Sequence, residues 1–352
     1  MTWSTGFSKA VAAFTIGATI AGCSTTIPSP TPSPQPTGTP ALAGIDALNA
    51  RLGRGVNLGN ALEAPKEGDW GITLQESDFR LIREAGFNSV RVPIRWSGHA
   101  LDAPPYTIEP AFVQRVDWVV AQSLKQGLAV VLDMHHYDEL LQSPEQQTPR
   151  FLGIWQQIAS HYQNYGKGVY FELLNEPHDI PAATWNDLAA RAISTIRPSN
   201  PDRAIIVGPV DYYSHRRLND LILPADDRNL IVTFHYYLPF QFTHQSAEWV
   251  NGSSAWLGTL WQGNSSDTSN IDFDLDIAQE WGKTNHRPIY LGEFGAYSKA
   301  DLASRGRWTA YVARQAEARQ MSWAYWEFRA GFGVYDGASK RWNETLKKAL
   351  LP

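Results

Sequence analysis

Short apolar runs alternate with amphipathic stretches along the chain from residue 41 onward. The runs are rich in β-branched and aromatic residues, which is typical of buried strands, and they lie at residues 54–58, 87–93, 128–134, 169–174, 204–208, 230–235, 288–291 and 322–326. The stretches between them repeat apolar residues with a helical period, which predicts helices at 74–84, 112–126, 151–163, 185–196, 274–283 and 307–320, with a closing helix at 342–349. A further helical stretch at 218–223 is weak.

This alternation predicts a (β/α)8 barrel of the α/β class, folded as a single domain over residues 41–352. Barrels of this kind run to about 250 residues or more, so the chain length favours one barrel over two domains. In such a barrel the catalytic groups lie at the carboxyl ends of the strands.

The first residues have the pattern of a targeting segment. Lys9 is followed by an apolar run at residues 10–22, which is shorter than the roughly 20 residues of a membrane span but suits the core of a signal peptide. The run ends in Ile20-Ala21-Gly22-Cys23, which resembles a bacterial lipobox, and Cys23 is the only cysteine of the chain. We therefore expect a lipoprotein signal peptide at residues 1–22 and lipidation at Cys23; an ordinary cleaved signal is the alternative.

Residues 23–40 form an expected linker between this anchor and the barrel. Six prolines fall within residues 28–40, mixed with Ser, Thr and Gly, and such a composition favours an extended stalk. A tail without a spacing role fits the same composition. The expected location is the bacterial cell envelope, with the protein lipid-anchored at the outer membrane or cell surface. Ser24, directly after Cys23, is compatible with sorting to the outer membrane.

The charge balance narrows the class of partner. A formal net charge of −5 and an isoelectric point near 6.0 provide no basic surface for nucleic acid. The chain holds 14 Trp, 14 Tyr and 14 Phe, whose flat faces can stack on sugar rings or simply fill the core. A neutral polysaccharide suits this balance, and we expect a monomer without a cofactor.

Two glutamates each end a predicted strand. Glu176 lies in VYFELLNEPH and Glu293 in PIYLGEFGAY. Paired carboxyl groups at strand ends fit glycoside hydrolysis, in which one protonates the leaving oxygen while the other attacks or activates water. An isolated glutamate after a strand is usually only a surface or capping residue, so the pairing carries the prediction.

Other polar and aromatic residues fall at or just beyond strand ends: Arg91, His135, His235 and Trp326. Side chains alternate along a strand, so Glu172 is expected to point into the barrel on the same side as Glu176. A buried Glu172 needs a cationic partner, and Arg91 is the nearest candidate.

Seven segments, in their order along the chain, resemble glycoside hydrolase family 5, the cellulase family: GVNLGNALEAP, NSVRVPIRW, VVLDMHHY, FELLNEP, VTFHYYLPF, LGEFGAY and AYWEF. The likeness to bacterial endoglucanases of this family that also act on mannans extends to FTHQSAEWV and GEFGAYSKAD. The resemblance covers essentially all of residues 41–352. It implies a retaining mechanism with Glu176 as acid/base and Glu293 as nucleophile.

The residues themselves suggest how the pair is supported. A partly apolar site would keep Glu176 protonated, and the Asn175 amide can donate to a sugar hydroxyl. Arg91 can hold Glu293 ionised and aimed, or it can serve only to neutralise Glu172.

His135 and His136 raise the question of a metal site. Adjacent residues on a strand point to opposite faces, so the two are not expected to share one ion, and no metal is predicted. His135 is expected to bind sugar hydroxyls, and His136 to orient a neighbour or fill space.

The remaining site predictions follow from the resemblance. His235 and Tyr237 match residues that contact the nucleophile and the sugar, and Trp326 matches the platform under the sugar to be cleaved; a core role is the alternative for each. Four residues are expected to line the non-reducing side of the groove: Asn60, Glu63, His244 and Trp249. The long segment 239–272 is expected to be a loop that walls the groove.

The predicted activity is that of a retaining endo-β-1,4-glucanase acting on β-glucans, with mannans as a further candidate substrate, and without metal or cofactor. The alternatives within the fold are a β-mannanase, a mixed-linkage glucanase and a xyloglucanase. A non-catalytic, surface glycan-binding lipoprotein is the alternative of another class. It does not require an acid and a nucleophile together.

Overall fold

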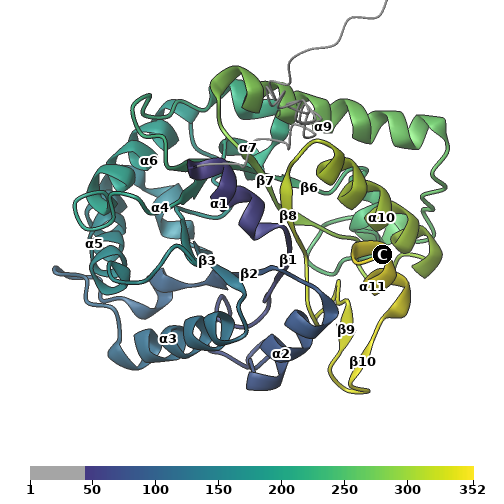
Figure 1. Ribbon diagram of the computed structural model, residues 1–352, viewed down its shortest axis with the longest axis horizontal. Coiled ribbons are helices and arrows are strands. Elements are labelled where there is room, and N and C mark those ends of the chain that lie inside the picture. The colour runs from purple at the N-terminus through teal and green to yellow at the C-terminus, as the bar shows by residue number, and fades with distance from the viewer. Residues whose placement is uncertain (1–43) are drawn as a thin grey trace, which may run out of the picture. The chain divides into compact units, whose positions relative to one another are not determined.

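The computed structural model describes residues 44–352, and the expected signal peptide, Cys23 and linker lie outside this range. Eight parallel strands close into one barrel in the order in which they occur along the chain (Figure 1). They are β1 (Arg54–Asn57), β2 (Ser89–Ile94), β3 (Ala129–Met134), β4 (Val169–Glu172), β5 (Ile205–Val207), β6 (Leu230–Tyr236), β7 (Ile289–Phe294) and β8 (Ser322–Tyr325). The predicted fold class is confirmed.

Helices surround the barrel in the expected alternation. They are α2 (Glu76–Ala85), α3 (Pro110–Lys125), α4 (Asp138–Gln142), α5 (Pro144–Tyr162), α6 (Ala182–Ile196), α7 (Val210–Tyr213), α8 (Phe240–Thr243), α9 (Ser265–Asn285), α10 (Leu302–Ala318) and α11 (Glu344–Leu350). Three 3₁₀ turns, η1 (Trp96–His99), η2 (His215–Asp220) and η3 (Ser253–Trp256), and a small hairpin of β9 (Tyr335–Asp336) and β10 (Arg341–Trp342) complete the fold. The weak stretch at 218–223 overlaps η2 only at residues 218–220. Within residues 44–352, no helix combines the length and apolar character needed to cross a bilayer.

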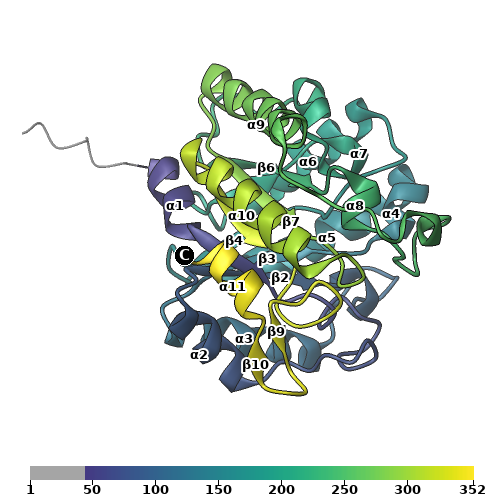
Figure 2. The ribbon, with the colours of Figure 1, turned by 90° about the vertical axis from the view of Figure 1, so that its right-hand side faces the viewer.

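One helix that the sequence pattern does not predict, α1 (Gly44–Leu52), covers the amino end of the barrel. Ile45 and Leu52 pack against the lower barrel residues, and the Asn49 amide donates to the carbonyl of Ile289 (3.0 Å). Figure 2 shows α1 at one end of the barrel, with α4 and α8 at the other. The first described residue therefore lies at the end opposite to the carboxyl ends of the strands.

Buried tryptophans fix three outer helices to the barrel. The indole nitrogens of Trp155 in α5, Trp185 in α6 and Trp308 in α10 donate to the carbonyls of Leu173, Gly208 and Leu238 (3.1, 2.8 and 3.0 Å). Each carbonyl lies just after β4, β5 or β6. These bonds therefore fix the backbone at the carboxyl ends of β4, β5 and β6, close to the residues of the site.

The prediction that all of residues 239–272 form a loop is wrong for the second part of this segment. Helix α9 begins at Ser265, because the Asn264 side chain caps it by accepting from the backbone N–H groups of Ser266 and Asp267 (both 3.0 Å). Its first turns are polar and largely exposed, so they lack the apolar period that marks a helix in sequence.

Candidate active site

A hollow of about 1120 Å³ lies at the carboxyl end of the barrel. The structure brings eleven of the predicted residues together around it: Asn60, His135, His136, Asn175, Glu176, His235, Tyr237, His244, Trp249, Glu293 and Trp326. They come from the segments that follow β1, β3, β4, β6, β7 and β8, or from the strand ends themselves. Because the carboxyl ends of all eight strands meet at one end of the barrel, residues that lie far apart in sequence are brought together there.

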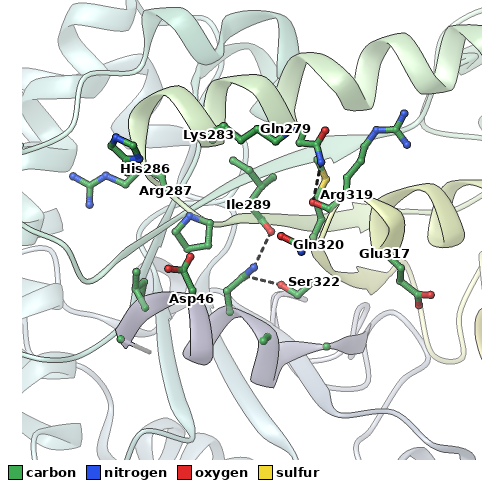
Figure 3. Close-up of a pocket in the computed structure, with 18 of the residues that line it drawn as sticks. Asp46, Gln279, Lys283, His286, Arg287, Ile289, Glu317, Arg319, Gln320 and Ser322 are labelled. Atoms are coloured by element: carbon green, nitrogen blue, oxygen red, sulfur yellow. Dashed lines mark hydrogen bonds between the residues drawn. The ribbon is translucent and has the colours of Figure 1, made fainter. Parts of the chain in front are cut away.

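A second hollow, of about 950 Å³, lies at the amino end of the barrel beside α1 (Figure 3). Its residues include Asp46, Lys283 and Glu317, and Asn49 there accepts from the Ser322 hydroxyl (2.7 Å). None of the predicted catalytic residues lines it. The predicted catalytic residues therefore lie at the opposite end of the barrel.

Arg91, on β2, connects the carboxyl groups inside the barrel. It is fully buried and forms a two-pronged pair with Glu172: Nε donates to Oε2 (2.7 Å) and Nη2 to Oε1 (2.9 Å). Its Nη1 donates to Oε1 of Glu293 (2.7 Å), and Nη2 also lies 3.0 Å from Asp133 Oδ2. Both roles considered for Arg91 are thus present in one side chain.

Glu293, at the end of β7, is held from two sides. Arg91 binds its Oε1, and the Tyr237 hydroxyl donates to its Oε2 (2.8 Å). Donors on both oxygens stabilise the ionised form and fix the plane of the carboxylate. This is the arrangement that an attacking carboxylate requires.

Glu176 follows β4 and has a left-handed backbone, with φ of 46°. Its Oε1 lies 2.6 Å from Nδ1 of His235, and no guanidinium contacts it among the described residues. Beside it, Asn175 Oδ1 accepts from Arg91 Nη2 (2.9 Å). That bond turns the Asn175 amide N–H groups toward the hollow, where a sugar hydroxyl can accept from them.

Burial decides the charge state of the pair. It raises the pKa of Glu176 and of Glu293, each to about 7, and the two carboxyl groups cannot both ionise without cost. Because two donors hold Glu293 in its ionised form, the proton of the pair rests on Glu176. Burial also lowers the pKa of His235 to about 4, so its neutral Nδ1 can accept from protonated Glu176 or donate to ionised Glu176.

The spacing of the pair indicates the mechanism. One carboxyl oxygen of Glu176, one of Glu293 and one nitrogen of His235 all lie within 4.8 Å of one another. Carboxyl groups about 5 to 5.5 Å apart are typical of direct displacement, whereas activation of an intervening water needs roughly 6.5 Å or more. The same three groups could in principle hold a metal ion, but Arg91 already supplies the positive charge at Glu293.

Comparison with known proteins agrees with this geometry. The family model "Cellulase (glycosyl hydrolase family 5)" matches residues 53–331. The chain belongs to glycosyl hydrolase family 5.

Relatives of this family 5 chain include Endoglucanase H of Acetivibrio thermocellus, 35% identical over 298 residues, which are 84% of this chain and 32% of that protein. The cellulase/esterase CelE of the same organism is 31% identical, with 78% of this chain and 35% of that protein covered. The chain thus spans about a third of the length of these two relatives. Structures of Thermotoga maritima Cel5A with mannotriose and with cellobiose match with a TM-score of 0.86 and 50% identity, over 87% of this chain and 99% of theirs.

The two adjacent histidines of this family 5 protein do not point to opposite faces, so that expectation is wrong. Strand β3 ends at Met134, and His136 turns through a left-handed backbone with φ of 50°. Both rings line the hollow, 4.6 Å apart and nearly perpendicular. Nδ1 of His135 lies 2.5 Å from Asp133 Oδ2, which fixes the ring and directs its Nε2 away from that carboxylate.

The expectation that Glu63 lines the groove is also wrong. Glu63 is 1% exposed and lies behind Asn60, where its carboxyl accepts from the backbone N–H groups of Asn60 and Ala61. Asn60 itself lines the hollow with a left-handed backbone, φ of 63°. The capping role of Glu63 thus shapes the turn that presents Asn60.

The lining residues that the sequence pattern does not single out include Tyr212 and Glu327. Tyr212 lies in a turn with left-handed backbone from Asp211 to Tyr213 and stacks on His178, with ring centroids 4.4 Å apart. Glu327 directly follows Trp326 after β8, the same strand-end placement that marks Glu176, so that signal could have identified it.

The segment after β6 lines one wall of the hollow. His244 and Trp249 lie with their ring centroids 6.3 Å apart, and Trp249 is 60% exposed. Phe240 stacks on His244 at 4.1 Å. An exposed indole at the rim of a polar groove suits stacking on a sugar ring.

Proposed function

We propose that this protein is a retaining endo-β-1,4-glucanase that hydrolyses internal bonds of β-glucans. The observation that carries the proposal is the facing pair of Glu176 and Glu293, within 4.8 Å of each other at one end of the barrel, with donors on both oxygens of Glu293. The membership in family 5 and the relatives named endoglucanases support the same activity.

In the first step an oxygen of Glu293 attacks the anomeric carbon of the sugar bound next to Trp326. The bond from that carbon to the leaving oxygen breaks, and Glu176 gives its proton to this oxygen, so the shortened chain leaves as an alcohol. The enzyme then carries a glycosyl ester on Glu293. Asn175 can bind a sugar hydroxyl whose contact tightens as positive charge develops on the ring.

In the second step the roles reverse. Ionised Glu176 takes a proton from water, the water oxygen bonds to the anomeric carbon, and the ester bond to Glu293 breaks. The two inversions leave the configuration of the sugar unchanged. Nδ1 of His235 lies 2.6 Å from Oε1 of Glu176 and orients this carboxyl group in both steps.

Mannan is the second candidate substrate, and one observation favours it. The similar structures of Thermotoga maritima Cel5A include a complex with mannotriose as well as one with cellobiose. Glucose and mannose units differ in the orientation of one hydroxyl, so a groove with a few adaptable polar contacts can hold both. Initial rates on carboxymethylcellulose, mixed-linkage β-glucan, glucomannan and xyloglucan would rank these substrates, and activity on xyloglucan alone would contradict the proposal.

The test of catalysis is reducing-sugar release by the wild type and by Glu293→Gln. Gln keeps the shape of the side chain but cannot form the ester intermediate. We expect release by the wild type and a loss of several orders of magnitude in the variant, since the two-step mechanism depends on the covalent glycosyl intermediate. Equal, negligible release by both would favour the glycan-binding lipoprotein.

We further propose that the chain is anchored by lipid at Cys23, on the basis of the lipobox-like sequence. Cys23→Ser should move the protein from the membrane fraction to the soluble fraction and abolish labelling by a fatty acid; unchanged membrane binding would contradict the proposal.

A further inference from the structure

Three consecutive residues at the end of α7, after β5, have a left-handed backbone although none of them is glycine. Asp211, Tyr212 and Tyr213 have φ values of 59°, 60° and 56°. This conformation brings Cβ close to the backbone and is normally adopted by single glycine or asparagine residues, so three in a row cost conformational energy. Such strain persists only where the surrounding contacts hold it. The contacts of this turn therefore indicate what the strained backbone holds in place.

Tyr213 connects the turn to the segment that carries the proposed acid. Its side chain is fully buried, and its hydroxyl donates to the carbonyl of Leu174, two residues before Glu176. Burial raises the pKa of the phenol, so the hydroxyl keeps its proton and remains a donor. The ring lies over Gly208, where a Cβ would overlap it. The backbone that leads into Glu176 is thus fixed from the side of β5.

Tyr212 holds the same segment on the other side of Glu176. The backbone N–H of Tyr212 donates to the carbonyl of Pro177 (3.4 Å), and its ring stacks on the ring of His178 with the two planes 9° apart. Nδ1 of His178 in turn donates to the carbonyl of Glu176 (2.7 Å). The turn therefore holds the chain both before and after Glu176.

The turn also supports the carboxyl group of Glu176 through His235. Ser214, directly after the turn, forms a parallel β-bridge with His235 on β6. The ring of Tyr213 meets the His235 ring edge to face, with centroids 5.0 Å apart, and Nδ1 of His235 lies 2.6 Å from Oε1 of Glu176. A shift of the turn would therefore move both the backbone of Glu176 and the histidine that contacts its carboxyl group.

We propose that the turn at residues 211–213 positions the acid of the reaction, and that Tyr213 is the positioning residue through which it does so. This inference rests on the proposed role of Glu176 and adds to it a residue that does not line the groove. A general acid must lie within hydrogen-bond reach of the oxygen that it protonates. Loss of the Tyr213 hydroxyl frees the carbonyl of Leu174, so the proton of Glu176 is no longer held in line with the leaving oxygen.

The proposed nucleophile is held by other residues. Arg91 on β2 and Tyr237 after β6 donate to the two oxygens of Glu293 (2.7 and 2.8 Å). A change in the turn therefore leaves the attacking carboxylate aimed and disturbs proton transfer. A substrate whose leaving group needs no proton should then be cleaved almost as fast as by the wild type.

The decisive variant is Tyr213→Phe, which removes the hydroxyl and keeps the ring. The quantity measured is kcat/KM on cellotetraose and on dinitrophenyl β-cellobioside, since kcat/KM reports the first bond cleavage. Cellotetraose needs the proton of Glu176 and is expected to lose about 10- to 100-fold, whereas dinitrophenolate leaves without a proton and its substrate is expected to lose less than about threefold. A loss on dinitrophenyl β-cellobioside as large as that on cellotetraose, or no loss on either, would overturn the proposal.

Tyr170→Phe is the matched control. Tyr170 lies on β4, is fully buried, and its hydroxyl also donates to a backbone carbonyl, that of Leu48 (2.8 Å), but at the amino end of the barrel. Both variants lose one buried hydrogen bond of the same kind, so we expect similar falls in melting temperature. Only Tyr213→Phe is expected to lose activity on cellotetraose. The same selective loss in Tyr170→Phe would show that any weakening near β4 disturbs the acid, and the proposal would be wrong.

A measurement without substrate separates this inference from the proposed activity. The backbone N–H of Asn175 donates to the carbonyl of Met134 (2.8 Å), so its hydrogen exchange reports how firmly the segment before Glu176 is held. Exchange in residues 173–178 is expected to be at least about tenfold faster in Tyr213→Phe than in the wild type, and unchanged in Tyr170→Phe. This difference would stand even if every glucan proved inert to the wild type, which would contradict the proposed function alone. Equal exchange in the wild type and Tyr213→Phe would overturn the positioning role of Tyr213.

Discussion

The hydroxyl of Tyr237 offers the sharpest test of how Glu293, the proposed nucleophile, is kept ionised. It donates to Oε2 of Glu293 at 2.8 Å, while Arg91 donates to Oε1. Tyr237→Phe removes one oxygen atom and leaves the ring, which packs against Phe332 and His244, in place. The variant therefore isolates one charge-assisted hydrogen bond.

The expected size of the effect follows from that bond. A hydrogen bond to a charged group is worth about 1.5–3 kcal/mol, which corresponds to about 10- to 150-fold in rate. Loss of the donor favours the protonated form of Glu293, so its pKa rises. The acidic limb of kcat/KM therefore moves to higher pH, and the activity lost is greatest on the acidic side.

The assay is kcat/KM for a cello-oligosaccharide from about pH 4 to about pH 9, for the wild type, Tyr237→Phe and Tyr311→Phe. Tyr311 is the matched control, since its hydroxyl also donates to a carboxylate, that of Asp272 (2.7 Å), but between α9 and α10 and outside the groove. A uniform drop at all pH values, with the acidic limb unmoved, would refute the assigned role of Tyr237.

Further predictions concern the acid, the buried cation and the backbone beneath the platform. Because burial raises the pKa of Glu176 to about 7 and its protonated form is the active acid, kcat/KM of the wild type should fall as pH rises through about 7. Glu176→Gln should remove this limb and cost about 10²- to 10⁴-fold on glucans, but far less on aryl glycosides whose leaving group needs no proton. Arg91→Lys should lower the free energy of unfolding by about 3–5 kcal/mol, measured by denaturant, since it breaks the two-pronged pair with Glu172. Gly295→Ala should lower the melting temperature, because its Cβ would lie only 2.1 Å from the Trp326 carbonyl oxygen.

The strands could be predicted from sequence because each is buried on both faces. All eight predicted runs overlap an observed strand, as expected when parallel strands are covered by helices on one side and fill the barrel on the other. The predicted strand boundaries are wrong where polar site residues interrupt the apolar sequence pattern. The run at 288–291 stops short of Phe294, because Gly292 and Glu293 break the apolar sequence although both lie in β7.

The closeness of Glu176 and Glu293 could be predicted for the same reason that the strands could. Glu176 and Glu293 end two apolar runs, and the closed topology of the barrel then brings them together. The position of His136 could not be predicted, since it depends on a left-handed residue just after β3. The burial of Glu63 depends on the turn around Asn60, which no local period in the sequence records.

The protonation of the groove follows from the barrel interior as a whole. Asp133, Glu172 and Glu293 all contact the single guanidinium of Arg91, and burial raises the pKa of each of these carboxyl groups. One cation cannot neutralise three carboxylates, so any further acidic group near them ionises only at a cost. Glu176 is such a group, and it is the one with the fewest donors, so it keeps its proton. The excess of carboxyl groups inside the barrel, and not one particular hydrogen-bond partner, therefore keeps the proton on Glu176, the proposed acid.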